Sequence, residues 1–219
     1  ALKADMVGCV CTNSSPAMAV YGTKTPLIGT NPLAIAIPAG DQLPIVLDMS
    51  TSVVARGKIR YAALTGHPIP PGWARDVDGK PTQDAKVALK GSLEPVGGVK
   101  GSALSLIIDI VCGILTHTVL TGGVKNITDV SGPSQTGHFF AALDISRFMD
   151  TKRFKSDIDQ VITDIKQLPA VDSGQIFMPG EIEFNLSRKR MEEGIPLEDE
   201  VISSLNGVAA RYGVAPLAD

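Results

Sequence analysis

The sequence predicts an α/β (α+β) fold with a mixed, mainly antiparallel sheet flanked by helices, and two observations support this. Short β-type runs dominate the first half of the chain, whereas helical patterns dominate the final third. Few segments alternate as strand, helix and strand, which is the pattern of a doubly wound parallel sheet. We therefore expect one sheet built early in the chain and a helical C-terminal part.

The expected strands are short apolar runs bounded by Gly, Pro, Ser and Thr, at residues 6–12, 31–37, 44–48 and 137–145. The expected helices show helical periodicity and lie at 54–64, from about residue 100 onward, and at about 151–167, 181–193 and 198–211. Between them, residues 65–98 read as a long loop, and its first part, residues 65–84, carries four of the 15 prolines.

The segment Ser102–Leu120 is long and mostly apolar, so it raises the question of a membrane span. Asp109 lies near its middle and His117 near its end, and its uncharged part is shorter than a span requires. We therefore expect a helix buried in a protein core, with no membrane partner.

Bulk composition excludes several classes of protein. Hydrophobic residues make up 44% and charged residues 20% of the 219 residues, which is an ordinary globular balance. The net charge of −3 provides no basic field, so nucleic acid is not an expected partner. Three cysteines cannot all pair, and Cys9 and Cys11 have no further ligand pair to complete a metal site, so we expect a cytoplasmic protein without a metal centre.

The stretch "GGVKGSALSLIID", from Gly97, is the strongest local signal. Two glycines, then Lys100, Gly101 and Ser102, lead directly into a predicted helix. Free backbone amides at a helix start attract anions, glycines allow close approach, and a lysine adds a positive charge. The segment matches neither a P-loop nor a Rossmann fingerprint. A phosphate-bearing ligand would be bound here; the alternative is a Gly-rich turn capped by Ser102.

The stretch "IFMPGEIEF" contains a second helix start of this kind, at Pro179, Gly180 and Glu181. The simpler interpretation is a helix with an acid in its first turn, which is stabilising by itself.

The apolar run "PIVLD" reads as a strand sealed inside a sheet, and Asp48 ends it where another apolar residue would be expected. It either caps the following turn or lies at the open end of a sheet. In the second case its carboxylate could orient a histidine general acid and stabilise the histidine's positive charge.

In their order along the chain, "TNSSPAMAVYGTKTPLIGTNPLAIAIP", "PIVLDMSTS", "GHPIPPGWARDVDGKPTQDA", "GGVKGSALSLIIDI" and "GHFFAALDI" resemble the malate/L-lactate dehydrogenase family. The resemblance covers nearly the whole chain. It implies an NAD(P)-dependent oxidoreductase with a non-Rossmann fold around a large, mainly antiparallel sheet. It also implies a homodimer that acts on a small-molecule carboxylate, a 2-oxo or 2-hydroxy acid or a cyclic imine.

The resemblance also assigns roles to residues of this chain. Residues 1–150 would form the NAD(P)-binding sheet domain, and residues 151–219 a helical segment that completes the cofactor site and packs on an upstream lobe. Asp48 would pair with the catalytic histidine. NAD or NADP would be held by Ser14, Pro44, Ile45, Val46, Leu47, Asp48, Met49, Ser50, Val99, Lys100, Gly180, Glu181 and Ile182.

One part of the family pattern has no match here. The family's catalytic histidine belongs to an "SHGxxR"-type motif, and its substrate-binding arginine also lies upstream, in roughly a third of the enzyme. We therefore expect these 219 residues to be the later part of a longer protein and to be inactive alone. The alternative is a catalytically inactive nucleotide-binding or structural module.

Overall fold

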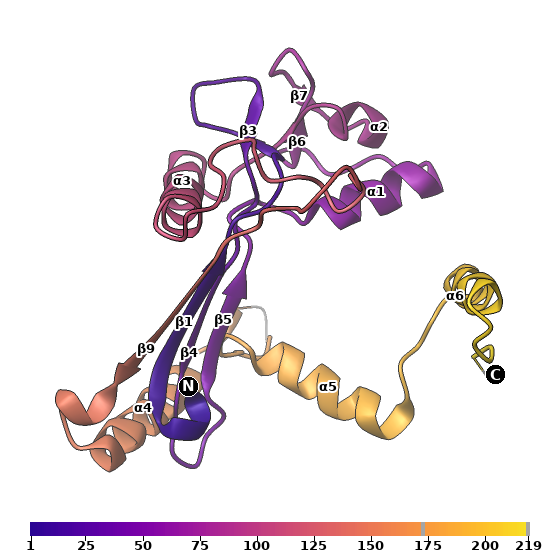
Figure 1. The fold of residues 1–219 in the computed structure, drawn as a ribbon. Coiled ribbons are helices and arrows are strands. Elements are labelled where there is room, and N and C mark those ends of the chain that lie inside the picture. The colour runs from indigo at the N-terminus through magenta and orange to yellow at the C-terminus, as the bar shows by residue number, and fades with distance from the viewer. Residues whose placement is uncertain (172–173, 218–219) are drawn as a thin grey trace. The chain divides into compact units, whose positions relative to one another are not determined.

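The computed structural model describes residues 1–171 and 174–217, in two compact units (Figure 1). The first unit contains residues 1–180 and the second residues 181–219. The boundary expected at residue 150 separates the predicted NAD(P)-binding sheet domain from the helical segment. That functional division stays a prediction.

The first unit is built on a four-stranded sheet in the order β5-β4-β1-β9, in which all neighbours are antiparallel. The long strands run between the end of the unit that holds α4 and the end that holds α1 and α3 (Figure 1). Apolar and small residues in these strands match the predicted runs to within a few residues, and the predicted fold class is confirmed. The strands are β1 (Met6–Thr12), β4 (Leu33–Ile37), β5 (Ile45–Met49) and β9 (His138–Asp144).

A second, five-stranded sheet in the order β3-β2-β8-β6-β7 lies largely within segments that were expected to be loops. Its strands are only two or three residues long, so they carry no readable alternation. Met18, Ile28 and Leu93 from this sheet pack with Ile59 of α1 in the main apolar core. The strands are β2 (Met18–Ala19), β3 (Pro26–Ile28), β6 (Ala74–Arg75), β7 (Pro81–Thr82) and β8 (Ser92–Leu93).

The five longer helices lie close to the predicted ones, whereas the short α2 lies in the segment that was expected to be a loop. Local signals mark some of the helix ends. Asp150 caps α4 by accepting from the Arg153 N–H, and Gly66 ends α1 in the left-handed conformation. The helices are η1 (Leu2–Ala4), α1 (Arg56–Thr65), α2 (Ala85–Ala88), α3 (Val99–Gly113), η2 (Ile145–Arg147), α4 (Thr151–Lys166), α5 (Glu181–Glu193) and α6 (Asp199–Arg211). None of the helices in residues 1–171 and 174–217 is long and apolar enough to cross a membrane.

Helix α3 is buried on one face only, which differs from the fully core-buried helix that its composition predicted. Ile108 and Cys112 on that face join a small apolar cluster, and the polar residues beside them are buried as well. Ser102, Ser105 and Asp109 are at most 2% exposed. They bond to neighbouring loops: the Ser102 hydroxyl accepts from the Tyr21 N–H, the Ser105 hydroxyl donates to the Gly29 carbonyl, and Asp109 accepts from the Thr121 N–H.

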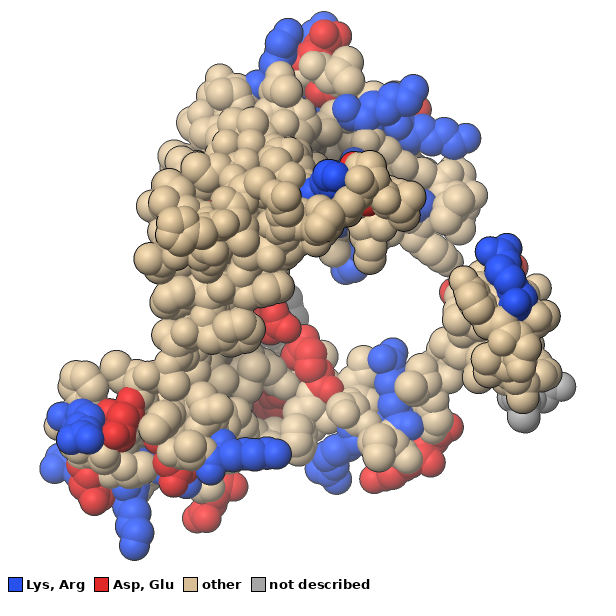
Figure 2. All heavy atoms as spheres, viewed as in Figure 1, with Lys and Arg blue, Asp and Glu red and all other residues tan. Residues whose placement is uncertain are grey.

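The opposite face of α3 is apolar and exposed. Ile107 is 57% exposed and Ile114, just beyond the helix, 55%. Uncharged residues cover the region of α3 in the view of Figure 2. Hydrogen bonds to loops and the burial of Ile108 and Cys112 therefore decide together how this helix is oriented.

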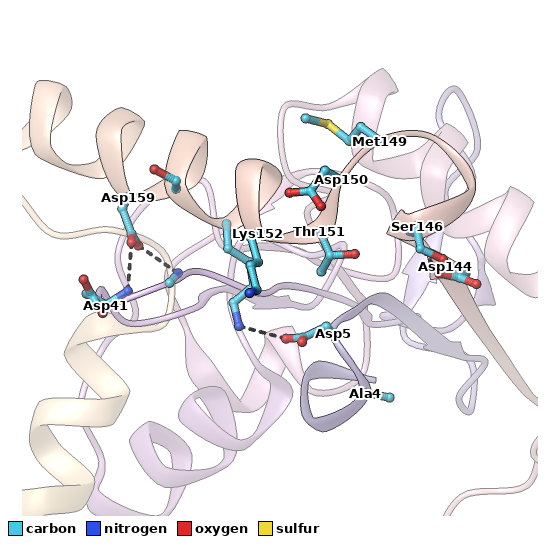
Figure 3. A pocket seen from close by; sticks show the side chains of 13 residues that line it. Ala4, Asp5, Asp41, Asp144, Ser146, Met149, Asp150, Thr151, Lys152 and Asp159 are labelled. Carbon is cyan, nitrogen blue, oxygen red and sulfur yellow. Dashed lines mark hydrogen bonds and ion pairs between the residues drawn. The ribbon is translucent and has the colours of Figure 1, made fainter.

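The β4–β5 turn is held by one carboxylate from α4. Asp159 accepts from the backbone N–H groups of Gly40, Asp41 and Gln42 at 2.8–3.1 Å (Figure 3). Burial acts to raise the pKa of Asp159, but the bonds from these N–H groups outweigh it, and the net effect is a lowered pKa.

We expect Asp159→Ala to lower the free energy of unfolding by about 1 kcal/mol at neutral pH. The expected loss is small for a carboxylate with three N–H partners, because solvent screens its charge. Since the folded pKa is depressed, this stabilisation is complete above the ordinary value near 3.8 and disappears as pH falls through the lower folded value. Chemical denaturation of Asp159→Ala beside Asp157→Ala, an exposed acid on the same helix, measures this. Equal losses from both variants would contradict a special role for Asp159.

Candidate functional site

Asp48 lies on β5, which is an edge strand of the long sheet. It faces Ala34 of β4 across the antiparallel ladder, and its side chain is exposed. The sequence indicated a strand sealed inside a sheet, and this was wrong: Ile45, Val46 and Leu47 are only half-buried. An edge strand has one neighbour instead of two, so its side chains and its carboxylate remain accessible.

The start of α3 is a tight glycine turn, but it lacks the free amides expected there, because the N–H groups of Lys100 and Gly101 donate to the Gly97 and Val96 carbonyls. Gly97 and Gly98 both have φ near +60°, a conformation that L side chains rarely adopt. Val99 and Lys100 follow in the first turn, and both side chains are exposed. A Cβ on Gly101 would lie 2.7 Å from the Thr51 carbonyl oxygen, so only glycine allows α3 to lie this close to the end of β5.

The turn before α5 lies against the same strand. The Val46 N–H donates to the Pro179 carbonyl at 2.9 Å, and a Cβ on Gly180 would be 2.9 Å from the Val46 Cβ. Gly180 has φ of +88°, which again favours glycine. Glu181 and Ile182 begin α5 in the second unit; Glu181 is buried and Ile182 is 54% exposed.

Ser14 connects to the far end of β5 through backbone contacts. Its hydroxyl accepts from the Thr30 N–H at 3.1 Å, and the Thr30 carbonyl accepts from the Thr51 N–H at 3.1 Å. The predicted residues of the first unit therefore follow one path along β5, from Gly180 beside Val46, past Asp48, to the segment that contacts Ser14 and the α3 start. The structure thus brings the two glycine-marked turns onto one strand, with the acid between them.

The chain was next compared with known proteins. Residues 1–206 match the family model of malate/L-lactate dehydrogenase. The chain belongs to this family. It is 39% identical over 214 residues to a malate/(S)-sulfolactate dehydrogenase of Methanothermus fervidus, a match that covers 98% of this chain and 62% of the relative. It is 33% identical to a Δ1-pyrroline-2-carboxylate reductase of Ancylobacter novellus, with 96% of this chain and 61% of the relative covered.

Solved structures support the same membership. A sulfolactate dehydrogenase of Methanocaldococcus jannaschii superimposes with a TM-score of 0.86 at 35% identity, covering 97% of this chain and 61% of that one. A malate dehydrogenase of Entamoeba histolytica gives a TM-score of 0.90 at 27% identity, with 98% and 63% covered. The chain thus spans about three fifths of the length of its family relatives.

Two buried polar residues that were not predicted from the sequence organise the end of the long sheet that lies near Ser14 and α3. Asn31 is fully buried; it accepts from the Ser14 N–H and donates to the Ser105 carbonyl, so it ties the Ser14 loop to α3. Thr51 is fully buried, and its hydroxyl oxygen has no hydrogen-bond partner within the described ranges. "GTNP" places Asn31 before a proline, which was the only available signal.

Cys11 and Cys112 form a buried thiol pair with low reactivity. The sulfur atoms of Cys11 and Cys112 lie 3.7 Å apart in a small apolar cluster. Burial, followed by the hydrogen bond and charge of Cys11, raises the pKa of Cys112 to about 12, so its thiol stays protonated. The part of the chain that the structure describes contains no group of three or more potential metal ligands from His, Cys, Asp and Glu.

A larger cavity, of about 900 Å³, lies near α4 at the opposite end of the sheet (Figure 3). Its acids already have structural partners. Asp159 holds the β4–β5 turn, Asp144 and Asp150 cap η2 and α4, and Asp5 pairs with Lys155 at 2.9 Å. These contacts account for four of the acidic residues without a ligand, while the fifth, Asp41, contributes its backbone N–H to Asp159.

Proposed function

We propose that this chain forms the cofactor-binding part of an NAD(P)-dependent oxidoreductase that acts on a small 2-oxo or 2-hydroxy acid. The observation that carries the proposal is the convergence on β5: Gly180 lies against Val46, Gly101 lies against Thr51, and Asp48 lies between them on the strand. The names of the relatives, which include malate and sulfolactate dehydrogenases, support this substrate class.

The residues present fit a dinucleotide. Gly101 and Gly180 let the chain pack closely on the Thr51 carbonyl and on Val46, which brings the starts of both predicted cofactor segments to β5. The Lys100 ammonium would hold a phosphate group at the α3 start. The N–H groups of Lys100 and Gly101 contribute less, because they already donate to the Gly97 and Val96 carbonyls. Glu181 and Ile182, at the start of α5, and residues 44–50 would supply the remaining contacts. When bound, the nicotinamide supplies or accepts the hydride.

Asp48 has a separate role in this proposal. Its exposed carboxylate would accept a hydrogen bond from an imidazole, fix that ring's tautomer and stabilise its protonated form. The imidazole would then move a proton to or from the substrate oxygen.

Titration of the complete protein with NADH, followed by fluorescence, tests the proposal. Oxidation of the bound NADH with pyruvate, oxaloacetate or a cyclic imine then reports the substrate class. Tight binding without oxidation by any of these would favour an inactive nucleotide-binding module. Failure to bind either NADH or NADPH would remove the proposed function altogether.

We also propose a homodimer in the cytoplasm. The three free thiols fit a reducing compartment. The exposed apolar face of α3, with Ile107 at its centre, is the kind of surface that a second subunit covers.

We expect Ile107→Glu to convert a dimer to a monomer, because a charge would be buried without a partner in the interface. Light scattering coupled to size-exclusion chromatography measures this. The matched control is Val130→Glu, at an isolated site that is 94% exposed. A monomeric parent protein, or dissociation by both variants, would contradict the assignment.

A further inference from the structure

A cavity of about 490 Å³ lies beside the start of α1, away from the acidic end of the sheet; we call it the arginine pocket. Four segments of the first unit line it: the end of β1 with the loop after it, Thr30 before β4, the first turns of α1, and residues 124–138. Arg56, Arg60 and Lys125 line it together with hydroxyl side chains such as Ser14 and Thr136. None of the described residues lining this pocket is an Asp or a Glu.

The position of Arg56 is electrostatically unfavourable without an anion. It is the first residue of α1, where the helix dipole places partial positive charge, and the first turn contains no acid to offset it. Arg60 follows one turn later, and like charges at this spacing repel each other. Burial, and then the charge of Arg60, lowers the pKa of Arg56.

Arg56 is nevertheless held firmly in place. Its two terminal nitrogens donate to the Pro16 carbonyl at 3.3 Å and to the Leu89 carbonyl at 3.2 Å. Both partners are neutral, so the guanidinium is anchored but its charge is not balanced. An anchored guanidinium presents a rigid set of donors that matches a phosphate.

The other polar groups complete a donor set. Because the Ser14 oxygen accepts from the Thr30 N–H, its hydroxyl proton remains available to donate. The charge of Lys125 is partly balanced and one of its N–H donors is already used, since its ammonium lies near Asp129 and donates to the Ser131 hydroxyl. The two guanidinium groups therefore carry most of the available charge.

We propose that the arginine pocket is an oxyanion site that takes a phosphate monoester, held by Arg56 and Arg60 with help from the Ser14 hydroxyl. The phosphate could belong to the 2′-phosphate of NADP(H) or to a separate phosphorylated small molecule. The 2′-phosphate source rests on the proposed function, because Ser14 is one of the predicted cofactor residues. The binding of inorganic phosphate to the pocket does not rest on the proposed function.

Inorganic phosphate is the first probe, titrated calorimetrically into the complete protein at constant ionic strength. We expect Arg60→Gln to weaken phosphate binding about tenfold, as for the loss of one charge-assisted hydrogen bond. Arg60 is preferred to Arg56 because it is exposed and has no anchoring bond to a backbone carbonyl within the described ranges. Lys58→Gln is the matched control: it removes the same charge from the same exposed helix, but Lys58 does not line the pocket.

NADPH and NADH titrations of the same variants distinguish the two sources. If the source is the 2′-phosphate, Arg60→Gln weakens NADPH binding about tenfold and leaves NADH binding within twofold. If Arg60→Gln weakens inorganic phosphate alone, the pocket serves another phosphorylated molecule. If phosphate and NADPH bind the parent, Arg60→Gln and Lys58→Gln proteins equally, the proposal is overturned. Absence of binding by both dinucleotides would count against the proposed function, while the phosphate titration would still decide the pocket.

Discussion

Replacing Asp48 with Asn in the complete protein is expected to lower kcat by about two to four orders of magnitude, the range over which a positioned acid–base group contributes. Asn keeps the size of the side chain but loses the negative charge, so it no longer stabilises a protonated imidazole or fixes its tautomer. The apparent pKa in the pH–rate profile should fall, because the imidazolium loses its partner. Cofactor affinity should change little, since Asp48 lies on an edge strand with its side chain exposed.

Steady-state kinetics across a pH series, with NADH affinity measured separately, makes this distinction. Asp41→Asn is the matched control, because it is an exposed acid in the turn before the same strand and lies outside the predicted cofactor segments. Turnover within twofold of the parent enzyme and an unchanged pH profile would remove Asp48 from the catalytic assignment. A large drop with an unchanged pH profile would indicate a purely structural role.

Lys100→Ala is expected to weaken NAD(P)H binding about tenfold, with a smaller effect on kcat. Lys100 is exposed in the first turn of α3, next to the backbone amides that follow Gly97 and Gly98. Removing its charge takes away one charge-assisted contact to phosphate but leaves the amides in place. Fluorescence titration gives the dissociation constant directly.

Two further variants sharpen this test. Lys100→Arg keeps the charge and should recover most of the affinity. Lys90→Ala removes an exposed lysine outside the predicted cofactor segments and should bind like the parent protein. If Lys90→Ala and Lys100→Ala bound equally well, the α3 start would not be part of the cofactor site.

Much of the fold could be predicted because local signals were strong. The long strands carry apolar runs with clear boundaries, and α4 begins at an Asp cap and shows helical periodicity. The candidate site was also accessible to sequence reasoning in part, since Gly97, Gly98 and Gly180 all adopt positive φ where only glycine is favoured.

The second sheet could not be predicted, because its strands are too short to show a period. Met18 of β2 pairs with Leu93 of β8 across a separation that no local pattern encodes. The arginine pocket was missed for a similar reason. Arg56, Lys125 and Ser14 are distant in the chain, and only the folding of the 124–138 segment beside α1 brings them to one cavity.

By itself, then, the sequence determined the long strands, the helices and the glycine-marked turns, because backbone conformation and apolar periodicity are local properties. Only the tertiary structure decided which side of each element is exposed. Helix α3 shows the physical reason: its small hydroxyls and Asp109 make buried hydrogen bonds to loops, so Ile107 lies outside although the adjacent Ile108 is buried. Likewise, the position of β5 at the edge of the sheet, which no residue of β5 signals, leaves Asp48 accessible.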